Sequence, residues 1–137
     1  MTIVNNFEVL WDNGRDRFCL YSVPTERQYQ YIKGQPCITF GVSYENENYK
    51  GCEIFTFFDK PYMNLLDHVK KVDRDLEGSF RFYDMGADTD GFIDFTLKKS
   101  RLSVSGRLGA SFSSHSLMFS FDADQTLLAA LLQSLAL

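Results

Sequence analysis

From residue 101 to residue 108, apolar and polar side chains alternate without a break. Strict alternation predicts a strand with one buried face and one face in water. Related patterns occur in Ser79–Tyr83, Phe92–Leu97 and Leu117–Phe121, and short loops are expected between these segments. Because successive strands with short connections pair antiparallel, the second half of the chain is predicted to form an antiparallel meander.

Strands are also expected in the first third of the chain. The turn signal Asp12-Asn13-Gly14 precedes the predicted strand Arg17–Val23, and the segment Ile38–Val42 again alternates. The segment Cys52–Phe58 is apolar on both faces. We therefore predict that it lies at the centre of a sheet.

Between these two groups of strands, the hydrophobic period changes to that of a helix. Apolar residues from Tyr62 to Leu76 fall on one helical face, and Pro61 suits the first helical turn. Gly78 is a residue typical of a helix end. These features predict one central helix over about residues 61–77.

A second helix is predicted near the end of the sequence, over about residues 123–135. Asp122 or Asp124 can accept hydrogen bonds from its first amides, and leucines then form an apolar stripe. The stripe is expected to pack on the core, and packing against a partner is the alternative. The predicted fold class is α+β, a mostly antiparallel β-sheet meander packed by two helices, in a single domain over residues 1–137.

Size and charge limit the partners that the chain can have. It has 137 residues, a net charge of −4 and no apolar run long enough to cross a membrane. The first residues show neither the basic start nor the apolar stretch of a signal peptide, so the expected location is the cytoplasm. Because a mildly acidic chain does not attract phosphate backbones, no nucleic-acid partner is expected.

The three cysteines, Cys19, Cys37 and Cys52, are an odd number and lack the spacing of a redox or zinc motif. We expect buried free thiols, as is usual for a cytoplasmic protein. The alternative is a bridge between Cys37 and Cys52 across two paired strands.

An aspartate-rich segment, residues 84–91, invites comparison with a calcium-binding loop. The EF-hand pattern needs an acid at its first position and a glutamate at its twelfth, where this chain has Gly86 and Leu97. Asp90-Gly91 instead suits the positive φ angles of a hairpin loop. We predict no metal site and no cofactor.

The sequence contains no recognisable catalytic arrangement. His68 and His115 are far apart, and the serines around His115 lack the motif that exposes a nucleophile. The carboxylates stand in polar loops or at a strand start, where we expect them to be exposed. A binding protein is therefore favoured over an enzyme. Two alternatives stay open, a ligand-binding or enzymatic domain whose site assembles only in the fold, and an assembly subunit; the oligomeric state is also open.

Several segments between residues 36 and 137 follow an order that is known from one family. They are Phe55–Phe57, Leu65–Gly78, Phe80–Phe82, Gly91–Leu97, Leu102–Gly106 and Leu117–Leu127. In this order, and above all in an apolar strand followed by Asp-Gln-Thr-Leu and a leucine helix, the chain resembles the WapI-like immunity proteins of bacterial polymorphic toxin systems. The resemblance does not cover the first 35 residues.

The resemblance implies a cytoplasmic protein that binds the C-terminal domain of a cognate secreted toxin and occludes its active site. If that domain is a nuclease, its cleft is basic, and an acidic surface would speed association. Acids and tyrosines expected near loops are therefore the candidate partner-binding residues. They are Tyr44, Glu45, Glu47, Tyr49, Glu53, Tyr83, Asp84, Asp88 and Asp90.

Overall fold

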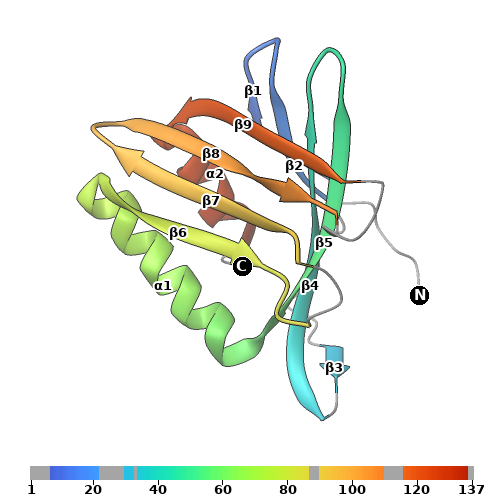
Figure 1. Cartoon of the computed structure of the whole chain (residues 1–137). Coiled ribbons are helices and arrows are strands. Elements are labelled where there is room, and N and C mark those ends of the chain that lie inside the picture. The colour runs from blue at the N-terminus through green and yellow to red at the C-terminus, as the bar shows by residue number, and fades with distance from the viewer. Residues whose placement is uncertain (1–6, 22–29, 33, 87–89, 110–115, 136–137) are drawn as a thin grey trace.

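The computed structural model describes residues 7–21, 30–32, 34–86, 90–109 and 116–135 (Figure 1). Within these ranges the chain forms nine strands and two helices. In chain order they are β1 (Phe7–Asp12), β2 (Arg17–Tyr21), β3 (Gln30–Ile32), β4 (Gln35–Glu45), β5 (Lys50–Phe58), α1 (Asp59–Asp75), β6 (Glu77–Tyr83), β7 (Phe92–Lys98), β8 (Arg101–Leu108), β9 (Leu117–Asp124) and α2 (Gln125–Leu135). The predicted α+β class with antiparallel sheet is confirmed.

The strands divide into two sheets rather than one continuous meander. Sheet A contains β1 to β5, with β4 at its centre between β2 and β5, and β1 outside β2. β3 pairs with the first residues of β4, beyond the end of β2. The pairs in sheet A are antiparallel, so the hairpins β1–β2 and β4–β5 lie side by side.

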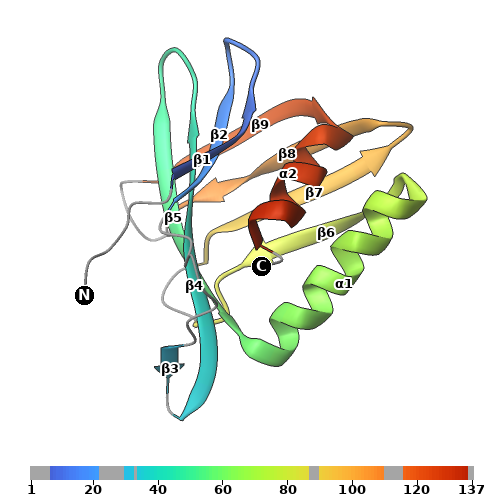
Figure 2. The ribbon, with the colours of Figure 1, turned by 180° about the vertical axis from the view of Figure 1, so that it is seen from behind.

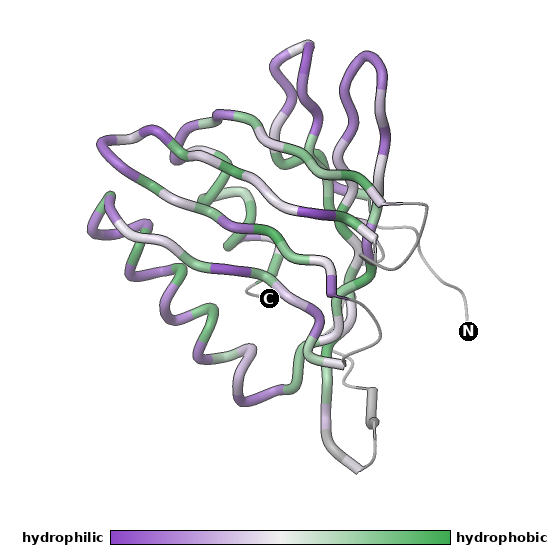
Figure 3. Tube along the Cα trace, viewed as in Figure 1, coloured by the Kyte–Doolittle hydropathy of each residue, from purple (hydrophilic) through white to green (hydrophobic). Residues whose placement is uncertain are grey.

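Sheet B contains β6, β7, β8 and β9 in chain order, which is the meander predicted for this part of the chain. In β8, Leu102, Val104 and Leu108 are buried, whereas Arg101 and Ser103 are exposed. The hydropathy along the strands of sheet B changes accordingly from residue to residue (Figure 3). The period of two therefore identified the buried and the solvated face correctly.

The two sheets and the two helices enclose one hydrophobic core. Sheet A stands across the ends of the strands of sheet B, α2 lies over one face of sheet B, and α1 runs beside β6 (Figure 2). The core is rich in aromatic rings, and Phe18, Phe57 and Phe95 are fully buried within it. The hairpin tips of sheet A project beyond this core (Figure 1).

Helix α1 extends over Asp59–Asp75, so it begins two residues before the predicted start. It buries Tyr62, Leu66, Val69 and Val72, which are residues of the predicted apolar face. The helix ends at Leu76, which adopts the left-handed conformation with φ of 57°. The prediction that Gly78 ends the helix is therefore wrong, because β6 already begins at Glu77.

Helix α2 begins at Gln125, two residues after the predicted start, and Asp124, one of the two predicted capping residues, stands directly before it. The Asp124 carboxylate accepts a hydrogen bond from the Thr126 amide at 2.9 Å, which satisfies one of the free amides of the first turn. Leu127, Leu128 and Leu131 are at most 1% exposed, so the leucine stripe packs on the core. Within the described part of α2, no leucine is exposed.

β5 is an edge strand of sheet A, and the prediction that it is central is wrong. Its free edge is closed near Thr56 by the chain that follows β6. Asp84 accepts a hydrogen bond from the Thr56 amide at 3.0 Å, and the Met85 amide donates to the Thr56 carbonyl at 2.8 Å. An unpaired edge is prone to pair with other chains, and these bonds remove part of it.

The three cysteines are free, as expected, but only two of them are buried. Cys52 is exposed and lies opposite Ser43 in the β4–β5 register, whereas Cys37 lies opposite Phe58. The alternative of a bridge between Cys37 and Cys52 is therefore wrong. Burial raises the pKa of the Cys19 and Cys37 thiols above the ordinary value. Neither helix in the described ranges is long and apolar enough to cross a membrane.

Candidate functional site between two hairpin tips

The turn between β1 and β2 is built by short polar side chains that bond to the backbone. Asp12 Oδ1 accepts a hydrogen bond from the Gly14 amide at 2.9 Å. Asn13 Oδ1 accepts hydrogen bonds from the amides of Arg15 at 2.9 Å and Asp16 at 2.7 Å. Gly14 supplies the positive φ, at 85°, that the turn requires. The sequence Asp-Asn-Gly therefore defines the shape of this tip.

The turn between β4 and β5 is built in the same way. Asn46 Oδ1 accepts hydrogen bonds from the amides of Asn48 and Tyr49, both at 2.9 Å. The Asn46 amide donates to the Tyr49 carbonyl at 2.9 Å. One asparagine side chain thus organises each tip, which is the usual role of asparagine in turns.

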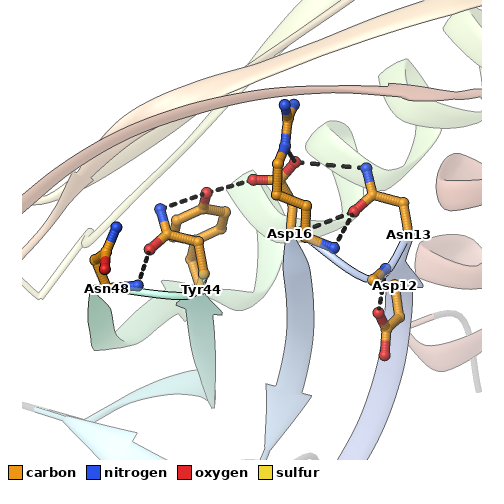
Figure 4. A network of polar contacts seen from close by, with 8 residues as sticks. Asp12, Asn13, Asp16, Tyr44 and Asn48 are labelled. Carbon is orange, nitrogen blue, oxygen red and sulfur yellow. Dashed lines mark hydrogen bonds and ion pairs between the residues drawn. The ribbon is translucent and has the colours of Figure 1, made fainter.

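A polar network joins the two tips to each other (Figure 4). Asp16, on the first tip, is only 4% exposed, and its Oδ1 accepts a hydrogen bond of 2.5 Å from the Tyr44 hydroxyl. Asn46 Nδ2 donates to the same hydroxyl at 3.3 Å, and Asn13 Nδ2 donates to Asp16 Oδ2 at 3.4 Å. Burial, followed by the hydrogen bond to Asp16, raises the pKa of Tyr44, so this hydroxyl remains a donor at neutral pH.

The network is anchored in the core through the ring of Tyr44. This ring stacks on Phe119 and Phe121 of β9, with centroid separations of 4.9 and 5.4 Å. The tips are consequently held by hydrogen-bonded turns, by the buried hydrogen bond between Tyr44 and Asp16 and by aromatic packing on sheet B. We infer that they form one rigid unit.

A hollow of about 610 Å³ opens between the two tips, and we call it the tip groove. Its lining residues are polar or glycine: Asp12, Gly14, Arg15, Arg17, Glu45, Asn46 and Glu47. Arg17 pairs with Glu45 at 3.3 Å, and Arg15 pairs with Asp16 at 3.3 Å. Glu47 takes no part in the ion pairs formed among the described residues. Five of the seven lining residues are therefore charged, three acids and two bases.

Two predicted partner-binding residues, Glu45 and Glu47, line the tip groove. A third, Tyr49, follows on the same tip and is 62% exposed. The fold thus brings Glu45 and Glu47 to the groove, whereas Tyr49 is exposed on the same hairpin tip outside the groove lining. The sequence patterns missed Asp12, Arg15 and Arg17, because only the pairing of β2 with β4 places them beside Glu45.

Tyr44 was expected as an exposed aromatic anchor, and this expectation is wrong. It is 3% exposed, because it lies on the face of β4 that packs on sheet B. Its contribution to the surface is indirect, through the position of the tips.

Glu53 and Asp84 were expected to be exposed, and they are 6% and 8% exposed. Glu53 points from β5 to the junction of the two sheets, where its Oε2 accepts a hydrogen bond of 2.7 Å from the Gly109 amide. Asp84 bonds to the free edge of β5, as described above. Each carboxylate accepts a hydrogen bond from a backbone amide. Both side chains therefore stabilise the fold and are not available to bind another protein.

The remaining candidates lie elsewhere. Tyr83 is 47% exposed at the end of β6 in sheet B, and Asp90 is exposed and pairs with Arg107 at 3.2 Å. Asp88 lies outside the described residues. No three His, Cys, Asp or Glu side chains of the described ranges are grouped so that they could hold a metal ion. His68 contacts the Ser79 carbonyl at 2.8 Å, and His115 is outside these ranges.

Comparison of the chain with protein-family models, with curated proteins and with solved structures gave no match.

Proposed function

We propose that this chain is an immunity-type binding protein, which neutralises a cognate bacterial toxin domain in the cytoplasm by covering its active site. The observation that carries the proposal is the tip groove, a charged concave surface between two rigid hairpins. Both the resemblance to WapI-like immunity proteins and the absence of a catalytic arrangement in the sequence agree with this function.

The rigidity of the tips favours binding of a protein partner. Association costs free energy when loops must become ordered, and a surface that is already ordered avoids this cost. The buried Tyr44–Asp16 hydrogen bond and the two asparagine turns fix the backbone before any partner arrives. A toxin domain could therefore bind without reshaping the groove.

The charges of the tip groove fit a partner that presents basic side chains. Asp12 and Glu47 carry carboxylates that no ion pair of the described residues uses, while Arg17 and Glu45 neutralise each other. The whole chain carries a net charge of −4. A basic nuclease domain would be attracted by this field, and its lysine or arginine side chains could pair with Asp12 and Glu47.

Tyr49 is the candidate for an aromatic contact with the toxin domain, since the groove itself is lined by charged and polar residues and a glycine. Tyr49 lies on the β4–β5 tip, outside the lining of the groove, and is 62% exposed. Tyrosine is enriched among the residues that dominate binding energy, because it combines a large apolar ring with a hydroxyl. We expect Tyr49 to be the main apolar anchor.

The test is co-expression in bacteria with the toxin C-terminal domain encoded in the neighbouring reading frame. Cells that make the domain alone should stop growing, and cells that also make this chain should grow. If growth is arrested in both cases, the proposed function is wrong.

The site itself is tested with the double variant E45K/E47K. It should slow association with the toxin domain and flatten the salt dependence of the rate, since two acids of the groove become bases. Glu77→Lys is the matched control, because Glu77 is exposed at the far end of β6. Equal association rates for the wild type and for E45K/E47K would exclude the tip groove as the binding surface.

A second candidate function is binding of a small polar ligand. It is favoured by the volume of the groove, about 610 Å³, which is within the range of roughly 300–1,000 Å³ found for ligand sites. Ligand sites are mostly lined by apolar side chains, however, and this groove has none among its lining residues. A protein loop with charged side chains is therefore the better fit.

A further inference from the structure

The face of sheet A that points away from the core carries an apolar patch. Phe7, Val9 and Ile54 on this face are 52%, 45% and 46% exposed. Tyr21 lies flat between them, since a side chain at Gly41 would come within 2.2 Å of its ring. We call this the outer face of sheet A. Exposed apolar side chains gathered on one face commonly mark interaction surfaces.

The strand register sorts the outer face into rows that cross β1, β2, β4 and β5. Directly paired residues point to the same side of a sheet, so each row shares one face. The three rows are Phe7, Tyr21, Gly41 and Ile54; then Val9, Cys19, Ser43 and Cys52; and then Asp12, Arg17, Glu45 and Lys50. The first row is apolar. In the second row Cys19 and Ser43 are only 1% and 9% exposed, so its exposed side chains are Val9 and Cys52 at the two edges. The third alternates acid, base, acid and base.

The alternating row is complementary to itself in reverse order. Consider a two-fold axis that lies between the two packed sheets, parallel to the strands and midway between β2 and β4. Rotation about this axis places β1 opposite β5 of the second copy, and β2 opposite its β4. Asp12 then faces Lys50, and Arg17 faces Glu45, so every acid meets a base. In the apolar row, the same rotation places Phe7 against Ile54 of the other copy.

We propose that the occupant of the outer face is a second copy of this chain, and that the protein forms a two-fold symmetric dimer by sheet-on-sheet packing. Two-fold interfaces require a surface that is complementary to itself, and the charge row meets this requirement. Two sheets that pack face to face keep their strands nearly aligned, which the proposed axis allows.

Sheet B provides a contrast on the same molecule. The corresponding charged row on its solvated face contains Glu77, Lys98, Arg101 and Asp124. The same two-fold rotation applied to this row would place Glu77 opposite Asp124 of the second copy, and Lys98 opposite its Arg101. Like charges would meet at every position, which is unfavourable. The solvated face of sheet B is therefore unsuited to the same packing.

The size of the outer face determines how strong the dimer is. The spacing of strands and residues gives the four-stranded patch an area of roughly 400 Å². Stable interfaces use about 800 Å² from each partner. We therefore expect a reversible dimer, which forms as the protein concentration rises.

The test is sedimentation velocity of the full chain at concentrations from about 5 to about 500 μM, which covers the affinity range expected for an interface of this size. The wild type should show a monomer–dimer equilibrium. Asp12→Lys and Lys50→Asp should each raise the dimer Kd about tenfold, because each creates two like-charge contacts across the axis. The double variant D12K/K50D should return the Kd to near the wild-type value.

The double variant separates pairing between copies from pairing within one copy. Within a chain, Asp12 neighbours Arg17, and Lys50 neighbours Glu45. Exchanging both charges makes both of these neighbours alike, so an effect within the monomer would be worse in the double variant. Only contact between copies predicts the rescue. Because Asp12 also accepts a hydrogen bond from Gly14, thermal unfolding of each variant checks that the fold is retained.

Ile54→Lys should abolish the dimer, and Met118→Lys should leave it unchanged. Met118 is the matched control because it is 67% exposed on the solvated face of sheet B. A protein that stays monomeric at every concentration overturns the proposal. So does a dimer whose Kd is unaffected by the single variants or is not rescued in the double variant. The inference does not rest on the proposed function, since it is tested without any toxin.

Discussion

Replacing Tyr44 by phenylalanine tests whether the buried network holds the hairpin tips in place. The variant keeps the ring, and hence the stacking on Phe119 and Phe121. It removes the hydroxyl that donates to Asp16 at 2.5 Å. Asp16, which is 4% exposed, then keeps only longer contacts, such as the 3.4 Å hydrogen bond from Asn13.

The expected loss of stability follows from the charge of the acceptor. A hydrogen bond to a charged group contributes about 1.5–3 kcal/mol, and a buried acceptor that loses its partner also keeps its desolvation cost. No cavity forms around the ring, so no packing loss is added. We expect Tyr44→Phe to lower the free energy of unfolding by about 2 kcal/mol, which corresponds to a decrease in Tm of roughly 8 °C for a chain of this size.

Urea unfolding followed by the fluorescence of Trp11, the single tryptophan, measures this change. Tyr49→Phe is the matched control on the neighbouring turn, and it should change stability by less than about 0.5 kcal/mol because Tyr49 is exposed. A double-mutant cycle with Asp16→Asn should give a coupling of about 1 kcal/mol or more. The reasoning is refuted if Tyr44→Phe costs no more than Tyr49→Phe.

Three further perturbations address the core and its pH dependence. Burial raises the pKa of Tyr44. The contribution of the Tyr44 hydroxyl to stability is therefore complete below about pH 10 and is lost as the pH rises through its pKa in the folded state. Urea unfolding between about pH 8 and 11 should show this decline in the free energy of unfolding, and a flat profile would contradict it. Leu131→Ala should cost about 3 kcal/mol, as measured by urea unfolding, because Leu131 is 1% exposed, while Met118→Ala should cost little. Gly106→Ala should destabilise by about 3 kcal/mol or more in thermal unfolding, since the new Cβ would lie 2.1 Å from the Phe92 carbonyl oxygen; a loss below about 1 kcal/mol would show that the strands can move apart.

Local patterns predicted both helices and the strands of sheet B, because the side chains of each of these elements are either buried in the core or exposed to water. The short strand β3 (Gln30–Ile32) was not predicted. The alternation in Arg101–Leu108 matches the burial of β8 along its whole length. The apolar stripe of α2 could also be identified, because its period matches a helix and its leucines had to be buried. The start of α1 was predicted two residues too late, because the local sequence determines the ends of helices only weakly.

The pairing of strands could not be predicted in the same way, since it depends on contacts between distant residues. The Tyr44–Asp16 hydrogen bond joins residues 28 positions apart, and the bond from Gly109 to Glu53 joins residues 56 positions apart. Read locally, Glu53 is an acid near a strand start, and such residues are usually exposed. Its burial becomes understandable only when the junction of the two sheets is known.

The two proposals concern overlapping surfaces, and this overlap has a consequence for binding. Asp12, Arg17 and Glu45 line the tip groove and also form part of the charge row on the outer face of sheet A. A second copy and a toxin domain would therefore compete for the same side chains. Binding equilibria that share a site oppose each other, so a toxin that binds more tightly than the second copy converts dimers to complexes. A weak dimer would then cover the apolar patch while no toxin is present, and it would dissociate at little cost when toxin appears.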